Sequence, residues 1–121
     1  MDMSEYMDIA LMTAGGPDGR VDLAEAFING AMGLAGESGE VIDEVKKHLF
    51  QGHQLNKRKI AEELGDVLWY VCLVAHSLGF SLDEVAEMNL RKLHRRYPKG
   101  HFDVEDSIRR ADLVSKGGET E

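Results

Sequence analysis

The chain has 121 residues, 43% of them hydrophobic and 30% charged, which is the composition of one globular domain with a real core. Its formal net charge of −8 argues against general binding to nucleic acid or to an anionic membrane surface. No apolar run reaches the roughly 18 residues of a membrane span, and the N-terminus lacks the basic start of a signal peptide. We therefore expect a cytoplasmic protein without nucleic-acid or membrane partners.

In chain order, helix start and stop signals predict helices over 4–14, 22–50, 56–79 and 81–96, with a further short helix at 104–113. Asp22 and Asn56 are suitable N-caps for the two long helices. Gly52 and Gly79 are suitable stops for the same helices. The sequence shows neither strand-period alternation nor an internal repeat. The expected fold class is all-α, a four-helix-type bundle without a β-sheet.

The domain boundaries follow from the same signals. A single domain over 1–121 is expected, with its motif-bearing core at about 20–102 and a polar, partly disordered tail at 103–121. The long helix carries glycines at 30, 33, 36 and 39, which predict a close approach of another helix or a ligand to its backbone. With only three long helices, the bundle is expected to borrow apolar cover from a partner chain.

Two pairs of carboxylates stand out because apolar residues surround them. Glu37 and Glu40 lie three residues apart in one long helix, and Glu63 and Asp66 have the same spacing in the next. Residues three apart share a helix face, so two facing helices would aim these carboxylates at one point. Such a cluster implies a cation, and oxygen ligands suit Mg²⁺, with Mn²⁺ as a substitute. The alternative is a pair of solvated helix faces, which explains the other acidic pairs of this spacing.

A basic segment on the last long helix is the second candidate for chemistry. Asn89, Lys92 and either Arg95 or Arg96 follow helical spacing there, in an otherwise acidic chain. Cations at a helix C-terminus favour the helix dipole, while arginine and lysine also neutralise phosphate oxyanions. A metal site together with a cationic clamp is suited to the cleavage of a phosphoanhydride.

Three further positions have both a structural and a functional interpretation. Trp69 belongs to the core or stacks on a nucleobase, and Asn29 bonds a base or ribose or a local backbone group. Cys72 lies in an apolar run, where a buried core thiol is expected. The basic segment at 57–59 is expected to form a solvated face.

Three motifs in a fixed order resemble the single-domain MazG-like members of the all-α nucleoside triphosphate pyrophosphohydrolases. The resemblance covers roughly residues 20–102 and depends on Gly36-Glu37-Ser38-Gly39-Glu40, Glu62-Glu63-Leu64-Gly65-Asp66 and Asn89-Leu90-Arg91-Lys92-Leu93. It departs from the family pattern at Gly36, where that pattern begins with a glutamate.

The resemblance implies Mg²⁺-dependent cleavage between the α and β phosphates of (d)NTPs, giving a nucleoside monophosphate and pyrophosphate, by a homodimer or homotetramer. It implies a metal-binding and catalytic role for the carboxylates Glu37, Glu40, Glu63 and Asp66, with Glu40 or Glu63 accepting the proton of the attacking water. It places Asn89, Lys92 and Arg96 at the phosphates.

Three alternatives stay open from the sequence. A sister enzyme would act on phosphoribosyl-ATP or dUTP. A nucleotide-binding regulatory module would keep the pocket without catalysis, an option that Gly36 keeps open. A purely structural bundle would show no response to Mg²⁺.

Overall fold

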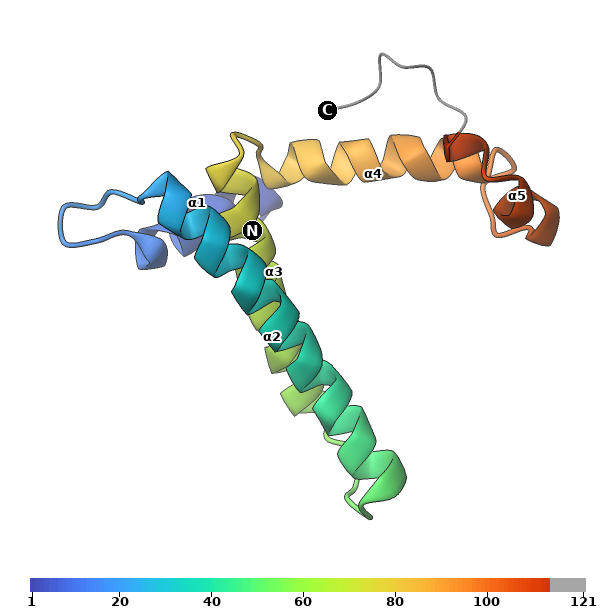
Figure 1. Ribbon diagram of the computed structural model, residues 1–121, viewed down its shortest axis with the longest axis horizontal. Coiled ribbons are helices and arrows are strands. Elements are labelled where there is room, and N and C mark those ends of the chain that lie inside the picture. The colour runs from blue at the N-terminus through green and yellow to red at the C-terminus, as the bar shows by residue number, and fades with distance from the viewer. Residues whose placement is uncertain (114–121) are drawn as a thin grey trace. The chain divides into compact units, whose positions relative to one another are not determined.

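The structure is a computed structural model that describes residues 1–113, and within them it is all-α, without a strand. Its elements are α1 (Met3–Ala14), α2 (Leu23–Phe50), α3 (Lys57–Ser77), α4 (Leu82–Arg96), α5 (Val104–Arg109) and the 3₁₀ helix η1 (Ala111–Leu113) (Figure 1). The predicted all-α class is confirmed. The disorder predicted for the end of the tail, at 117–121, lies outside the described residues.

The two long helices begin and end where the capping signals predict. The carboxylate of Asp22 accepts a hydrogen bond from the Glu25 backbone N–H at 2.9 Å, and the Asn56 side chain accepts one from the Lys59 N–H at 3.0 Å. Beyond the helix ends, Gly52 has φ +74° and Gly79 has φ +82°. These positive φ values favour glycine, so each helix is terminated there at low cost.

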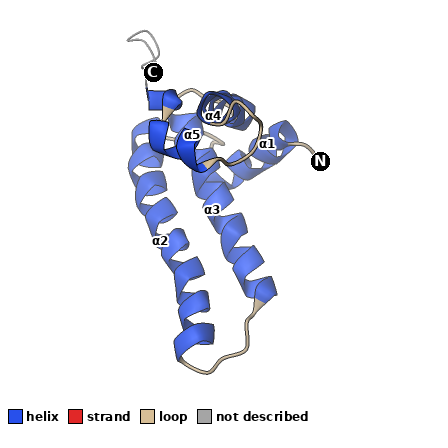
Figure 2. Ribbon diagram, turned by 90° about the vertical axis from the view of Figure 1, so that its right-hand side faces the viewer, coloured by secondary structure: helices blue, strands red, loops and turns tan. Residues whose placement is uncertain are grey.

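The chain clusters into two compact units, Met1–Leu82 and a second that begins at Asp83. In the first unit, α2 and α3 run antiparallel to each other as a long pair, joined at one end by the loop at 51–56 (Figure 2). The helix α1 packs on α3. The expectation of a single domain over 1–121 stays a prediction.

The core of the first unit lies where α1 meets α3. Its buried members are Met7, Ala10, Cys72 and Leu82. The backbone N–H of Leu82, the first residue of α4, donates to the Met7 sulfur of α1 at 3.4 Å. Cys72 is only 1% exposed and burial raises the pKa of its thiol, so the predicted core thiol is confirmed.

The glycines of α2 divide into two groups. A Cβ on Gly30 would lie 2.7 Å from Cγ2 of Val74, and one on Gly33 would overlap the ring of Tyr70. These two glycines therefore permit the close approach of α3 that the sequence predicts. A Cβ on Gly36 or Gly39 would meet nothing within 4 Å, so neither makes such an approach within the described chain.

The apolar side chains of α3 are only partly covered within the described chain. Leu64 on this helix and Leu78 at its C-cap are 54% and 55% exposed, whereas the buried residues of α3 are Glu63, Cys72, Leu73 and Ala75. Large apolar side chains of α2 are exposed as well, including Ile28 at 60% and Met32 at 70%. The pair α2–α3 thus presents apolar surface that this chain alone does not cover.

No single helix among the described residues is long and apolar enough to cross a membrane, and Lys57–Ser77 with Leu82–Arg96 meets that test only as a bent pair taken together.

The second unit is held by ion pairs. The helix predicted at 104–113 is split at Arg110, which has φ +52° and ends α5 before η1 begins. In η1 the carboxylate of Asp112 accepts two hydrogen bonds from Arg96 of α4, at 2.9 and 3.0 Å. Lys99 pairs with Asp103, the N-cap of α5, at 3.0 Å. These contacts join α4, α5 and η1 to one another.

Candidate metal centre

Three of the four predicted metal ligands come together between α2 and α3. One carboxylate oxygen each from Glu37, Glu63 and Asp66 lies within 4.8 Å of the other two. Glu63 is 5% exposed, Glu37 is half-buried and Asp66 is exposed. The close approach of the helices at Gly30 and Gly33 lies one to two turns before Glu37, and it brings carboxylates from the two helices together.

The fourth predicted ligand, Glu40, is exposed and lies outside this compact group, one turn beyond Glu37. It is close enough to act on the group electrostatically. The pKa of Glu37 is raised first by partial burial, then by its hydrogen bond with Glu63 and by the charges of Asp66, Glu63 and Glu40. The carboxylates therefore repel one another, and a protonated Glu37 relieves part of that repulsion.

Lys59 supplies the positive charge nearest to the group. Its Nζ lies 2.8 Å from Oε1 of Glu63, one turn along α3, and this contact lowers the pKa of Glu63. The expectation of a solvated face at 57–59 is confirmed, since all three residues are exposed. The Lys59 side chain, 46% exposed, pairs with Glu63 from that face. The four-residue spacing between Lys59 and Glu63 is the sequence signal that identifies this pair.

The donor set fits a divalent cation. Three clustered carboxylates carry more negative charge than one lysine neutralises, and all of their donor atoms are oxygens. Such a set suits Mg²⁺ or Mn²⁺ rather than zinc, which prefers nitrogen and sulfur ligands. Glu37, Glu63 and Asp66 are the residues that would hold the ion.

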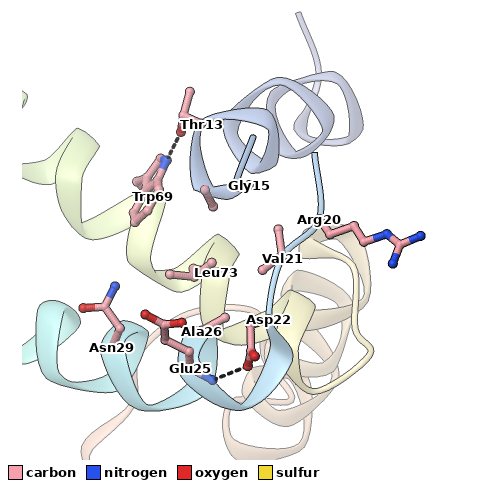
Figure 3. A pocket seen from close by; sticks show the side chains of 12 residues that line it. Thr13, Gly15, Arg20, Val21, Asp22, Glu25, Ala26, Asn29, Trp69 and Leu73 are labelled. Carbon is pink, nitrogen blue, oxygen red and sulfur yellow. Dashed lines mark hydrogen bonds between the residues drawn. The ribbon is translucent and has the colours of Figure 1, made fainter. Parts of the chain in front are cut away.

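A pocket of about 460 Å³ lies in the same unit, toward the N-terminal end of α2 (Figure 3). Both Asn29 and Trp69 line it, together with Thr13, Ala14, Gly15, Gly16, Arg20, Val21, Asp22, Glu25, Ala26 and Leu73. The indole Nε1–H of Trp69 donates to the Thr13 hydroxyl at 2.8 Å, which fixes the ring at the pocket wall. Pockets of this size hold small organic ligands.

The pocket and the carboxylates lie along the same helix pair. Asn29 precedes Glu37 by eight residues on α2, which corresponds to a rise of about 12 Å. Trp69 follows Asp66 by less than one turn on α3. A ligand as long as a nucleotide can therefore reach from the pocket toward the carboxylates.

The predicted phosphate-binding residues lie on α4, in the other compact unit. Asn89 and Lys92 are exposed on this helix, three residues apart, and their role at the phosphates stays a prediction. Arg96 is engaged within its own unit, because its guanidinium forms the two hydrogen bonds with Asp112. This pairing raises the pKa of Arg96 and gives the residue a structural role.

Some residues of these sites are not singled out by the sequence patterns. Thr13 and Trp69 are 56 residues apart, so no local spacing connects them. Glu25 appears in the sequence as the partner of the Asp22 cap, and its side chain is found at the pocket only in the structure. Tyr70 contacts Gly33 and packs edge-to-face on Trp69, with ring centroids 5.0 Å apart.

An all-α chain with a carboxylate cluster between two long helices, beside a pocket, fits a site for a divalent cation next to a site for a small molecule. A family model described as the MazG nucleotide pyrophosphohydrolase domain matches residues 28–101. The Gene 37 protein of Mycobacterium phage L5 is 40% identical over 86 residues, which cover 68% of this chain and 75% of that relative. No solved structure matches the chain. The chain belongs to the MazG nucleotide pyrophosphohydrolase family.

Proposed function

We propose that the protein is a Mg²⁺-dependent nucleoside triphosphate pyrophosphohydrolase that cleaves (d)NTPs between the α and β phosphates, releasing a nucleoside monophosphate and pyrophosphate. The observation that carries the proposal is the group of Glu37, Glu63 and Asp66, whose oxygens lie within 4.8 Å of one another on two facing helices. When bound, Mg²⁺ would neutralise phosphate oxygens and lower the pKa of a water molecule.

The residues of the chain have separate tasks in this proposal. Glu63 is buried and held by Lys59, so it is the fixed ligand of the group. Glu37 and Asp66 complete the ligand set from the two helices. Glu40 lies one turn beyond Glu37 and outside the compact group, so it is the carboxylate best placed to orient the attacking water and accept its proton.

The substrate would extend along the helix pair from the pocket to the carboxylates. Trp69 and Asn29 would hold the nucleoside end, because they line the pocket on opposite helices. Asn89 and Lys92 of α4 are proposed to bind the leaving phosphates, since an amide and an ammonium both donate to oxyanions. Arg96 would contribute only if it gave up its contacts with Asp112.

We further propose that the active protein is a homodimer or homotetramer, in which a second copy completes a four-helix bundle. The exposed apolar side chains of α2 and α3, among them Met32 and Leu64, support this assembly. A Cβ at Gly36 or Gly39 would meet nothing within 4 Å among the described residues, which leaves room for a partner helix near Glu37. Light scattering after size exclusion tests the assembly, and a monomer at micromolar concentration would contradict it.

Two other functions use the same observations. A sister enzyme acting on phosphoribosyl-ATP or dUTP would keep the carboxylates and differ in the pocket. A regulatory nucleotide-binding module would bind without cleavage, and Gly36, where the family pattern has a glutamate, keeps this alternative to the enzyme open. Nucleotide-dependent thermal stabilisation without pyrophosphate release would identify the module.

Pyrophosphate release from the eight common NTPs and dNTPs, with Mg²⁺ and with Mn²⁺, tests the proposed function. Separate Glu40→Gln and Asp66→Asn variants are expected to lose turnover and keep the helical circular-dichroism spectrum of the wild type. Full Mg²⁺-dependent activity in both variants would contradict the assigned roles. Release of inorganic phosphate in place of pyrophosphate would contradict the proposed cleavage position.

A further inference from the structure

The pocket beside Trp69 carries polar groups that no contact within the chain uses. Glu25 and Asn29 are four residues apart on α2, and Figure 3 shows both side chains on the side of the helix that faces Trp69 and Leu73. Within residues 1–113, no hydrogen bond or ion pair engages the Glu25 carboxylate or the Asn29 amide. Both groups are therefore available to a ligand.

The other polar side chains around the pocket are either committed or directed elsewhere. The Thr13 hydroxyl donates to the Ala10 carbonyl at 2.6 Å and accepts from Trp69. Asp22 caps α2 through the Glu25 backbone N–H. The Arg20 side chain is 89% exposed and points away from Trp69 and Leu73 in Figure 3. The groups that remain are an acceptor-only carboxylate and an amide that both donates and accepts.

This combination of a carboxylate and an amide favours a nucleobase with one particular pattern of hydrogen-bond donors and acceptors. A carboxylate at the pocket repels phosphate, so the base and not the triphosphate fits here. A carboxylate or an asparagine pairs well with the exocyclic amino group of cytosine or adenine, and the amide also donates to a neighbouring ring nitrogen. The 4-oxo or 6-oxo group of uracil, thymine or hypoxanthine would place an acceptor against the Glu25 carboxylate, which is unfavourable. The ring of Trp69 and the side chain of Leu73 supply the apolar wall.

We propose that this pocket selects nucleotides whose base carries an exocyclic amino group in place of the keto oxygen, namely cytosine and adenine nucleotides, through Glu25 and Asn29. This proposal adds a base preference to the proposed pyrophosphohydrolase function. Its kinetic test depends on that function. Glu25 is a specificity-determining residue in this view and takes no part in the cleavage.

Matched substrates that differ only in the amino group test the selection. CTP against UTP, and ATP against ITP, are compared by kcat/KM for pyrophosphate release and by calorimetric Kd for the corresponding monophosphates. We expect a preference of about tenfold or more for the amino member of each pair. Glu25→Gln, which keeps the shape of the side chain but can donate to a keto oxygen, is expected to remove most of that preference. Glu87→Gln on α4, outside the pocket lining, is the matched control and should retain it.

The two readouts separate failure of the selection from failure of the proposed function. Pyrophosphate release without an amino preference, or with a preference that Glu25→Gln leaves intact, overturns the selection and leaves the enzyme activity standing. A second outcome is that the monophosphates show a binding preference that Glu25→Gln removes, while no substrate releases pyrophosphate. That result would support the selection and contradict the proposed enzymatic activity. Absence of binding by all four monophosphates overturns the selection.

Discussion

Two buried carboxylates, Glu63 in the first unit and Asp112 in the second, have the same low exposure and opposite surroundings. Each residue is 5% exposed. Asp112 accepts four hydrogen bonds from the guanidinium groups of Arg96 and Arg110, at 2.9 to 3.3 Å. Glu63 has one lysine contact, and two further carboxylates lie within 4.8 Å of it.

The difference shows that burial of an acid does not by itself identify a functional site. Asp112 is fully compensated, because two cations surround one anion and leave it no capacity for a ligand. Around Glu63 the charges do not balance: burial, the hydrogen bond with Glu63 and the charges of the neighbouring carboxylates together raise the pKa of Glu37. A divalent cation is stabilised most where carboxylates lie close together without enough positive charge around them.

Removal of one charge at Glu63 has the largest expected effect. Glu63→Gln keeps the size of the side chain and removes the charge of the buried carboxylate that we propose as a metal ligand, so we expect pyrophosphate release to fall by about 100-fold or more. Initial rates at saturating substrate and varied Mg²⁺ measure the loss. The adjacent Glu62→Gln is the control, because the Glu62 side chain is 57% exposed and pairs with Arg58 on the helix surface. Equal activity of the two variants would contradict the metal centre.

The same kind of change at Asp112 is expected to act on stability. Asp112→Asn leaves Arg96 and Arg110 facing a neutral group in a buried position, so α5 and η1 should detach more easily from α4. We expect the melting temperature to fall by roughly 5 °C, with faster hydrogen exchange in α5. Activity at 20 °C should stay within a few-fold of the wild type. A loss of activity without a loss of stability would show that Asp112 positions Arg96 for the substrate.

The sequence predicts the helices and the acidic pairs because both depend on local spacing. The caps Asp22 and Asn56 act on backbone groups three residues away, and the carboxylates of each pair share one helix face. The sequence does not predict that Glu40 stays outside the compact group, since this depends on how far α2 and α3 approach at Gly33.

The partner of Arg96 is likewise not predictable from local patterns. Its helical spacing with Lys92 suggests a phosphate clamp, while its actual partner is 16 residues away in η1. That contact requires the reversal of the chain at Arg110, whose left-handed conformation no sequence pattern here indicates. The pocket is not predictable from local patterns either, because Thr13 reaches Trp69 only after α1 packs on α3.

A fall in pH should affect the carboxylates around Glu63 and the ion pairs of Asp112 differently. The pKa of Asp112 is lowered, so its stabilisation is present above the ordinary aspartate pKa of about 3.9 and is lost only as pH falls below it. The pKa of Glu37 is raised above 4.5, so the repulsion it causes is relieved as pH falls toward that range.

Melting temperature against pH, from 7 to 5, measures this difference with EDTA and with Mg²⁺. Without metal, we expect the first unit to become slightly more stable as Glu37 takes up a proton, while exchange in α5 stays unchanged. With Mg²⁺, stabilisation by the ion should decrease over the same range because protons compete for Glu37. Glu37→Gln should reduce the gain in stability of the metal-free protein as pH falls. A metal-free stability that falls with pH in this range would contradict the repulsion.

The smallest expected effect comes from Lys59, the cation that pairs with Glu63 on α3. Lys59→Met removes a charge that competes with Mg²⁺ for the same carboxylate, so the ion should bind more tightly. Because the lysine is 46% exposed, the gain should be modest, roughly two- to fivefold in Kd by calorimetry. Lys57→Met, two residues earlier and outside the ion pairs of α3, is the control. Weaker binding of Mg²⁺ in Lys59→Met would mean that the lysine holds Glu63 in its ligand orientation. Lys59 would then position Glu63 much as Arg96 and Arg110 position Asp112.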